Sequence, residues 1–357
     1  MKQIAVLIPA YQPDEKMCAL VPALRAENLS VFLIDDGSGP VYGPLFHVAA
    51  QMGAEVISYP ENHGKGYALK TGIAEAAAQG YTGVVTADAD GQHTVKDIVR
   101  IAEAMRQYPK ALVLGSRNTA EMPPRSRTGN RLTAFLFRAL YSIDLGDTQT
   151  GLRGIPLTEG RAEELLRLEG DRYEYEMNML IATPRLFSGI EEIAIKTIYI
   201  ENNASSHFRP VADGMRIYRL LFAKFPRFAL VSMLSFGIDY LLFTLFAYLF
   251  SFAAVPATIG ARVISAVCNY TMNRRWVFTG AQKYYTFGRY ALLALCILVL
   301  NCGLIWLLTN PLSIAPWCAK LITEGTLYCV SFSVQCRMAH KQDKDSPEKQ
   351  KATTKGQ

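Results

Sequence analysis

The sequence lacks the patterns of several common protein classes. Its seven cysteines include no C-x-x-C pair, which argues against a disulfide framework or a zinc site. No G-x-G-x-x-G follows the first strand-like run, and the P-loop spacing is absent around Gly64, so dinucleotide-binding and P-loop proteins are disfavoured. No signal-type segment precedes Ile4–Ile8, so we expect the soluble part to stay in the cytosol.

Charged residues are scarce in the last third of the chain. They make up 19% of the 357 residues, and the net charge is +6 from 37 Lys and Arg against 31 Asp and Glu. From about residue 225 to 336 long apolar runs dominate, which predicts a soluble α/β domain followed by a membrane-embedded one. Four of these runs approach the length of about 20 residues that a bilayer requires. They are residues 228–250, 255–272, 287–309 and 314–336.

The connections between the apolar runs alternate in charge. Lys and Arg are absent near 251–254 and 310–313, whereas Arg274, Arg275 and the C-terminal tail are basic. By the positive-inside rule, the basic connections, the N-terminal domain and both termini are cytoplasmic. The sequence therefore predicts a multi-pass protein of the cytoplasmic membrane with an even number of spans.

Four ionisable residues interrupt the apolar runs: Asp239, Arg262, Lys320 and Glu324. Such side chains are costly in hydrocarbon and usually face a helix bundle or a polar path. Lys320 and Glu324 are four residues apart and are expected to neutralise each other on one helix face. Two interpretations stay open, a structural polar seam and a path for a lipid headgroup.

Two segments read as basic amphipathic helices, Asp213–Phe225 and Asn130–Ile143. Each alternates large apolar residues with arginines, a pattern typical of helices in the membrane interface, although core-facing helices can share it. The expected domains are a soluble domain over 1–210, an interfacial linker helix over 211–226, a membrane domain over 227–338 and a disordered charged tail over 339–357.

Strand-like and helical patterns alternate in the first domain. This alternation predicts a mostly parallel sheet with helices on both faces, in which ligands bind beyond the C-terminal strand ends. The strand candidates are 4–8, 31–34, 55–58, 83–86 and 111–114, and the helix candidates include 65–79, 94–107 and 159–168.

Acidic residues follow one of the predicted strands. Asp88 and Asp90 flank a single residue at the end of 83–86, and Gln92 adds a further oxygen. Hard divalent cations such as Mg²⁺ prefer oxygen ligands, so these residues predict a metal site that could neutralise a diphosphate.

Seven motifs of the first domain occur in a characteristic order: Pro9-Ala10-Tyr11, Asp35–Ser38, Asn62–Gly66, Asp88–His93, Gly115–Arg117, Asp147–Gly154 and Arg172–Glu176. This set of motifs resembles family 2 glycosyltransferases of GT-A fold, and more narrowly the polyprenyl-phosphate glycosyltransferases of the dolichyl-phosphate mannose synthase type. The C-terminal third is similar to the four-span GtrA-type module through Asn269-Tyr270 and Asn273–Phe278.

The resemblance implies a role for each matched position. The nucleotide of the donor would contact Pro9, Tyr11, Asp35, Asp36 and Lys65. Asp88, Asp90 and Gln92 would hold Mg²⁺ or Mn²⁺ and the diphosphate. The catalytic set would be completed by Arg117, Arg131 and Arg209, which would grip the lipid phosphate, and by Glu176, which would orient sugar hydroxyls.

The implied reaction moves a monosaccharide from a UDP- or GDP-sugar onto undecaprenyl or dolichyl phosphate, with inversion at the anomeric carbon. The expected partners are the nucleotide-sugar, the lipid phosphate and the bilayer. No nucleic acid is expected, and a homo-oligomer is left open. Two alternatives remain: transfer to a diacylglycerol-type lipid or a growing glycan, and translocation of a lipid-linked sugar by the GtrA-like module.

Overall fold

The computed structural model describes residues 2–120, 122–196, 210–249, 251, 253–279 and 285–340. It divides into two compact units. The N-terminal unit contains residues 1–135 and 144–220, and the C-terminal unit contains 136–143 and 221–357. Most of the predicted charged tail, residues 341–357, lies outside the described residues.

Seven strands of the N-terminal unit form one sheet in the order β3-β2-β1-β4-β6-β5-β7. All neighbouring strands are parallel except β6, which runs antiparallel to β4 and β5. The strands are β1 (Lys2–Ala10), β2 (Ser30–Asp36), β3 (Glu55–Tyr59), β4 (Tyr81–Thr86), β5 (Leu112–Arg117), β6 (Arg153–Pro156) and β7 (Ile190–Ile195). The five strands expected from the sequence are confirmed, and the mostly parallel GT-A-like sheet is as predicted.

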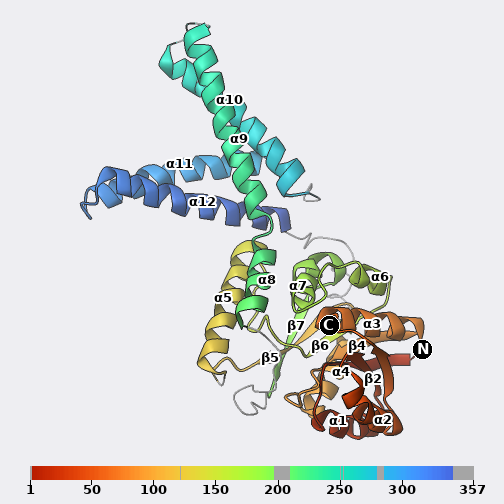
Figure 1. The fold of residues 1–357 in the computed structure, drawn as a ribbon. Helices are drawn as coiled ribbons and strands as arrows, with labels where there is room; N and C mark the ends of the chain where they lie inside the picture. The colour runs from red at the N-terminus through yellow and green to blue at the C-terminus, as the bar shows by residue number, and fades with distance from the viewer. Residues whose placement is uncertain are drawn as a thin grey trace, which may run out of the picture. The chain divides into compact units, whose positions relative to one another are not determined.

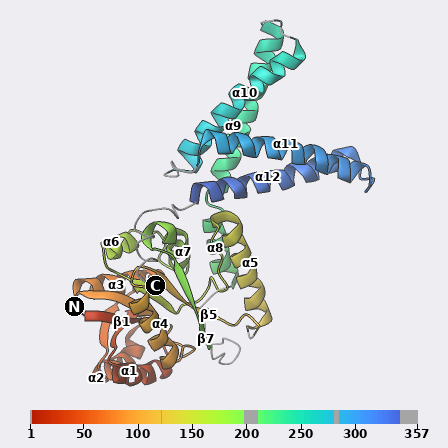
Figure 2. The ribbon, with the colours of Figure 1, turned by 180° about the vertical axis from the view of Figure 1, so that it is seen from behind.

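Helices cover both faces of this sheet (Figures 1 and 2). The helices are α1 (Lys16–Ala26), η1 (Pro40–Tyr42), α2 (Gly43–Gln51), α3 (Lys65–Ala78), α4 (Val95–Gln107), α5 (Pro124–Tyr141), α6 (Arg161–Leu166), α7 (Glu174–Leu186) and α8 (Pro210–Leu221). Helices α1, α2 and α4 contribute to one buried cluster with β1 and β2, and α3 packs on β1, β2 and β4 with α6 and α7 beside it.

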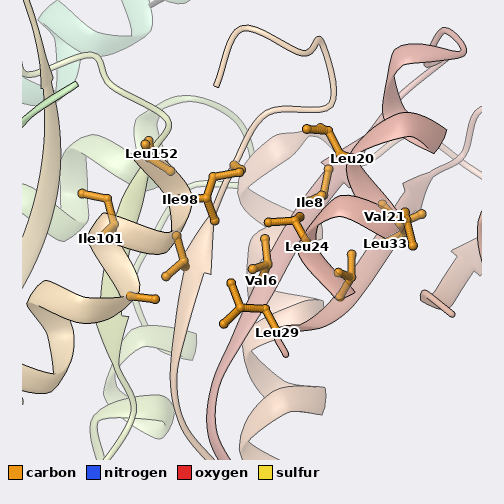
Figure 3. Close-up of a cluster of buried hydrophobic side chains, with 14 of the residues drawn as sticks. Val6, Ile8, Leu20, Val21, Leu24, Leu29, Leu33, Ile98, Ile101 and Leu152 are labelled. Atoms are coloured by element: carbon orange, nitrogen blue, oxygen red, sulfur yellow. The ribbon is translucent and has the colours of Figure 1, made fainter. Parts of the chain in front are cut away.

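The core consists of branched side chains from the central strands and the helices above them. Val6 and Ile8 of β1 meet Val21 and Leu24 of α1, as Figure 3 shows, and all four are buried. Because β1 is buried on both faces, it reads as a continuous apolar run rather than an alternating one. This core fixes the strand ends from which the site loops emerge.

Two helical hairpins make up most of the C-terminal unit. The first contains α9 (Phe225–Thr244), its π-helical extension η3 (Leu245–Leu249), α10 (Ala254–Met272) and a π-helical turn η4 (Asn273–Val277). The second contains α11 (Phe287–Thr309) and α12 (Pro316–His340).

Polar bonds join the helices of the first hairpin. Ser265 Oγ donates to Ser235 O, and Asn269 Nδ2 donates to Ser235 Oγ, each at 2.9 Å. Small residues and interhelical hydrogen bonds of this kind hold helices together where no hydrophobic effect can act.

By length and composition, two helical segments could span a bilayer: Phe225–Leu249 and Phe287–Thr309. The other two expected spans also fold as helices, α10 and α12, but Arg262 in one and Lys320 and Glu324 in the other lower their apolar character. The predicted pairing of Lys320 with Glu324 is confirmed, at 2.6 Å.

Candidate functional site

A lysine at the start of α3 bridges two carboxylates. Lys65 Nζ lies 2.7 Å from Asp88 Oδ1 and 3.2 Å from Glu176 Oε2. His93 Nε2 lies 3.3 Å from Asp88 Oδ2, and Arg153 Nη1 donates to Glu176 O at 2.7 Å. We call these five residues the Lys65 cluster. It joins four segments spread from residue 65 to residue 176: the start of α3, the loop after β4, the start of β6 and the first turn of α7.

Electrostatics keep the two central groups of the cluster charged. Burial by itself would raise the pKa of the Asp88 carboxyl, but the Lys65 ammonium and His93 hold that pKa well below its usual range. Burial likewise opposes the charge of Lys65, yet Asp88 and Glu176 raise the pKa of its ammonium above its ordinary value. The pair is therefore ionised throughout the physiological pH range.

The loop before β6 packs tightly against Asp88. Thr86 Oγ1, at the end of β4, donates to Gly151 O at 2.7 Å. A Cβ on Gly151 would overlap the carboxylate of Asp88, so only glycine allows this approach. Arg153 then enters β6, buried, with its Nε donating to Thr150 O at 2.9 Å. These contacts fix the position of Asp88.

The carboxylate of Asp90 is suited to a cation. Burial and the neighbouring charge of Asp88 raise the pKa of Asp90, and its Oδ1 accepts the backbone N–H of Gln92 at 3.0 Å. A divalent cation would relieve this repulsion between two carboxylates. Within the part of the chain that the structure describes, no group of three or more His, Cys, Asp or Glu residues is arranged to hold a metal.

The three predicted ligands therefore differ in their surroundings. Asp90 and Gln92 fit a cation site, because both offer oxygens in the loop after β4 and Asp90 is in no ion pair among the described residues. Asp88 is engaged by Lys65 and His93. Its charge raises the pKa of Asp90 and would act on a cation there through proximity alone.

The two acids at the end of β2 shape loops. Asp36 is buried and accepts hydrogen bonds from Tyr59 Oη, Asn62 Nδ2 and the backbone N–H groups of His63 and Gly64, at 2.9 to 3.1 Å. The last two bonds fix the turn that leads directly into Lys65. The structure thus gives Asp36 a role in placing Lys65, besides the nucleotide contact expected from the resemblance.

Asp35 and the end of β1 lie beside this turn. Asp35 Oδ1 accepts the backbone N–H of Ser38 at 2.9 Å, and Ser38 Oγ accepts that of Gln12 at the same distance. The register pairs Pro9 with Ile34, so Tyr11 follows β1 next to the end of β2. Pro9, Tyr11 and Asp35 are thereby brought to one edge of the sheet, as expected for parallel strands.

Arg117, at the end of β5, is engaged by a buried acid. Its Nη2 donates to Asp147 Oδ1 at 3.0 Å, and its Nε donates to Asp147 Oδ2. The loop that carries Asp147 is held by Asn130 of α5, which is fully buried; its Oδ1 accepts from Thr148 N and its Nδ2 donates to Gly146 O, both at 3.1 Å. This two-point contact orients the guanidinium plane of Arg117.

The other two predicted arginines are placed differently. Arg131 follows Asn130 on α5 and is exposed. Among the described residues, no hydrogen bond or ion pair links Arg131 to the Lys65 cluster. Arg209 lies outside the described residues.

Three residues of the site were not given roles from the sequence. His93, Asp147 and Arg153 all lie within the quoted motifs, but motif membership does not show which side chains pair. The signal available was that both motifs, 88–93 and 147–154, contain acidic and basic residues that could form ion pairs. Only the folded loops show that His93 and Arg153 contact the two acids that Lys65 bridges and that Asp147 binds Arg117.

Comparisons with known proteins match both parts of the chain. Residues 5–156 match the model of glycosyl transferase family 2. Residues 227–339 match the model of the GtrA/DPMS transmembrane domain.

Two characterised relatives are similar over more than half of the chain. The chain is 30% identical over 244 residues to a UDP-N-acetylglucosamine–dolichyl-phosphate N-acetylglucosaminyltransferase of Methanococcus voltae, covering 62% of this chain and 96% of that protein. It is 28% identical over 202 residues to an undecaprenyl-phosphate mannosyltransferase of Micrococcus luteus, covering 54% and 82%. A solved glucosyl-3-phosphoglycerate synthase of Mycobacterium tuberculosis gives a TM-score of 0.47 at 19% identity, over 62% of this chain and 79% of that one.

Proposed function

The chain belongs to glycosyl transferase family 2 and carries a GtrA/DPMS transmembrane domain, and from this premise we propose that it transfers a monosaccharide from a nucleotide-sugar to a polyprenyl phosphate. The products are a polyprenyl-phosphate-sugar and a nucleoside diphosphate. The names of both characterised relatives combine a sugar transfer with a polyprenyl phosphate. The acceptor would be undecaprenyl or dolichyl phosphate, and the donor a UDP- or GDP-sugar.

The observation that carries the proposal is the Lys65 cluster at the end of β4, with Asp90 beside it. A nucleotide-sugar brings a diphosphate of two negative charges, which requires cationic or metal groups around it. Lys65 supplies a fixed positive charge at the first residue of α3, where the helix N-terminus also favours anions. Asp90 and Gln92 would hold a divalent cation, which would stabilise the charge of the departing diphosphate.

The acceptor needs little activation. A phosphate monoester has a second pKa of about 6, so its oxygen is largely anionic at neutral pH and attacks without a strong base. The chain must instead bring two anions together against their repulsion. Arg117, oriented by Asp147, and exposed Arg131 would bind the phosphate of the lipid, and direct displacement at the anomeric carbon would invert its configuration.

The membrane position follows the same chemistry. The phosphate of a polyprenyl phosphate lies at the headgroup plane while its tail stays in hydrocarbon. Helices α5 and α8 expose large apolar side chains, including Phe135 at 65% and Met215 at 65%, on basic helices of the interfacial type. We place the N-terminal unit and both termini on the cytoplasmic side, because the basic connections favour that orientation.

The proposal is tested on the purified full chain with a panel of UDP- and GDP-sugars. Undecaprenyl and dolichyl phosphate serve as acceptors, and diacylglycerol is the hydroxyl-bearing control. Mass spectrometry of the lipid should show one polyprenyl phosphate heavier by one sugar. The signal should disappear with EDTA or with Asp90→Ala. Sugar on diacylglycerol alone, or full activity with EDTA, would overturn the acceptor or the metal assignment respectively.

A further inference from the structure

Each hairpin of the C-terminal unit carries a charged pair with at least one exposed member. Asp239 Oδ2 of α9 lies 3.2 Å from Arg262 Nη2 of α10, and Lys320 pairs with Glu324 on α12. The side chain of Arg262 is 72% exposed, and those of Lys320 and Glu324 are each 56% exposed. Charged groups facing lipid are costly even when they are paired. A polar surface from outside each hairpin would offset this cost.

The two pairs lie at matching levels of their hairpins. Arg262 is eight residues past Ala254, where α10 begins, and Glu324 is eight residues past Pro316, where α12 begins. At 1.5 Å per residue, each lies about 12 Å along its helix, well inside a hydrocarbon core of about 30 Å. In the topology expected from the sequence, where each hairpin leaves and returns on the cytoplasmic side, Arg262 and Glu324 would lie at the same depth.

A cavity beside Asp239 offers a second point of contact. It has a volume of about 260 Å³. Asp239 Oδ1 is buried and has no hydrogen-bond partner among the described residues, so this carboxylate can accept one more donor. The cavity is lined by Phe236, Asp239, Tyr240, Phe243, Thr258 and Ala261.

We propose that the hairpin of α9 and α10 docks on the hairpin of α11 and α12 from a second copy of this chain. Arg262 of one copy pairs with Glu324 of the other. Lys320 of that second copy extends into the cavity and donates to the free oxygen of Asp239. Each hairpin face carries one acid and one base, so the two faces are complementary in charge without any further partner.

The proposed dimer is symmetric. In a two-fold assembly the same contact occurs twice, so each dimer has two Arg262–Glu324 pairs. Reversing one charge of this pair places like charges together at both contacts. Mixing two copies, one reversed at each position, restores opposite charges at both contacts.

This symmetry gives the experiment. The full chain in detergent is examined by light scattering as the wild type, as Arg262→Glu, as Glu324→Arg and as the double variant. Differently tagged copies of the two single variants are also co-expressed and purified through one tag. We expect two copies per particle in the wild type, one in each single variant and two in the double variant. In the co-expressed pair we expect the copy that carries the other tag to be retained.

The outcomes separate copy–copy docking from other arrangements. A monomeric wild type, or single variants that stay dimeric, would overturn the proposal. Restoration in the double variant without retention in the co-expressed pair would show that the two hairpins dock within one chain. Arg167→Glu, whose side chain is also 72% exposed but lies in the N-terminal unit, is the matched control and should leave the dimer intact.

A milder pair of variants keeps the test valid if charge reversal prevents folding. Arg262→Gln and Glu324→Gln keep hydrogen-bonding groups and remove one charge each. Each should raise the dimer dissociation constant at least tenfold in detergent. Unchanged dissociation constants for both would also overturn the proposal. None of these measurements depends on transfer activity, so a failure here is distinguishable from a failure of the proposed function.

Discussion

Lys65 Nζ lies 2.7 Å from Asp88 Oδ1 and thereby connects the first residue of α3 to the loop after β4. The same ammonium reaches Glu176 in the first turn of α7. One positive charge thus holds two acids from separate segments. The position of Lys65 is itself set by Asp36, which binds the turn before it.

Replacing Lys65 by methionine should damage both activity and stability. Asp88 and Glu176 would lose their shared counter-charge. Removing one partner of a buried ion pair lowers the free energy of unfolding by about 3 kcal/mol. Transfer should fall roughly 100-fold or more, as expected when a preorganised charge is removed. Product formation and the unfolding temperature of the full chain measure the two effects.

Lys70→Met is the matched control for this change. Lys70 lies on the same helix, is 18% exposed against 16% for Lys65, and pairs with Asp171, which is 61% exposed. Because its partner is exposed, this ion pair contributes about 1 kcal/mol or less to the free energy of unfolding. Equal losses in the two variants would show that Lys65 has no special role.

Gly151→Ala tests the close approach to Asp88. A methyl group there overlaps the carboxylate, so Asp88 or the loop must move. Displacement of a site group by an ångström can cost roughly 100-fold in rate, and we expect a loss of that order in kcat. Gly189→Ala, where a Cβ meets nothing within 4 Å, should leave kcat unchanged. A fully active Gly151→Ala variant would contradict the assigned geometry.

Arg131→Ala should weaken binding of the lipid phosphate acceptor more than binding of the nucleotide-sugar donor. A charge-assisted bond to phosphate is worth about 1.5 to 3 kcal/mol, so the KM for the lipid phosphate should rise roughly tenfold or more. The KM for the nucleotide-sugar should change little. Arg138→Ala, an exposed arginine two turns further along α5, is the control. Equal increases for both substrates would contradict the acceptor role of Arg131.

His340 should make the stability of the chain depend on pH. Burial, together with the Lys224 ammonium, lowers the pKa of His340 from 6.5 to about 4. The unfolded chain therefore binds a proton between these values that the folded chain does not, and stability is lost as pH falls from 6.5 towards 4. Unfolding temperatures at pH 7 and pH 5 measure the loss.

His340→Phe should reduce this pH dependence. The ring contact with Tyr141, now at 4.8 Å and edge-on, can persist in that variant. His47→Phe changes an exposed histidine on α2 and should leave the pH dependence as it is. The same loss between pH 7 and 5 in His340→Phe as in the wild type would assign the effect to another group.

Much of the fold was predictable because local patterns agree with it. The five strand-like runs became β1 to β5, and those of β1 and β2 are continuously apolar because central parallel strands are buried on both faces. Strands β6 and β7 were missed. Arg153–Pro156 contains arginine, glycine and proline, and β7 is an edge strand with two glutamates, so neither shows a clear strand pattern.

The sequence by itself determined which residues follow each strand, and therefore that Asp35, Asp88 and Arg117 would lie at one edge of a sheet. Tertiary structure decided which side chains pair. Arg117 binds Asp147 and Lys65 joins Asp88 to Glu176 because loops distant in the chain meet at that edge. Periodicity reports only the face or end that a residue occupies, whereas a salt bridge depends on positions fixed by the packing of the whole domain.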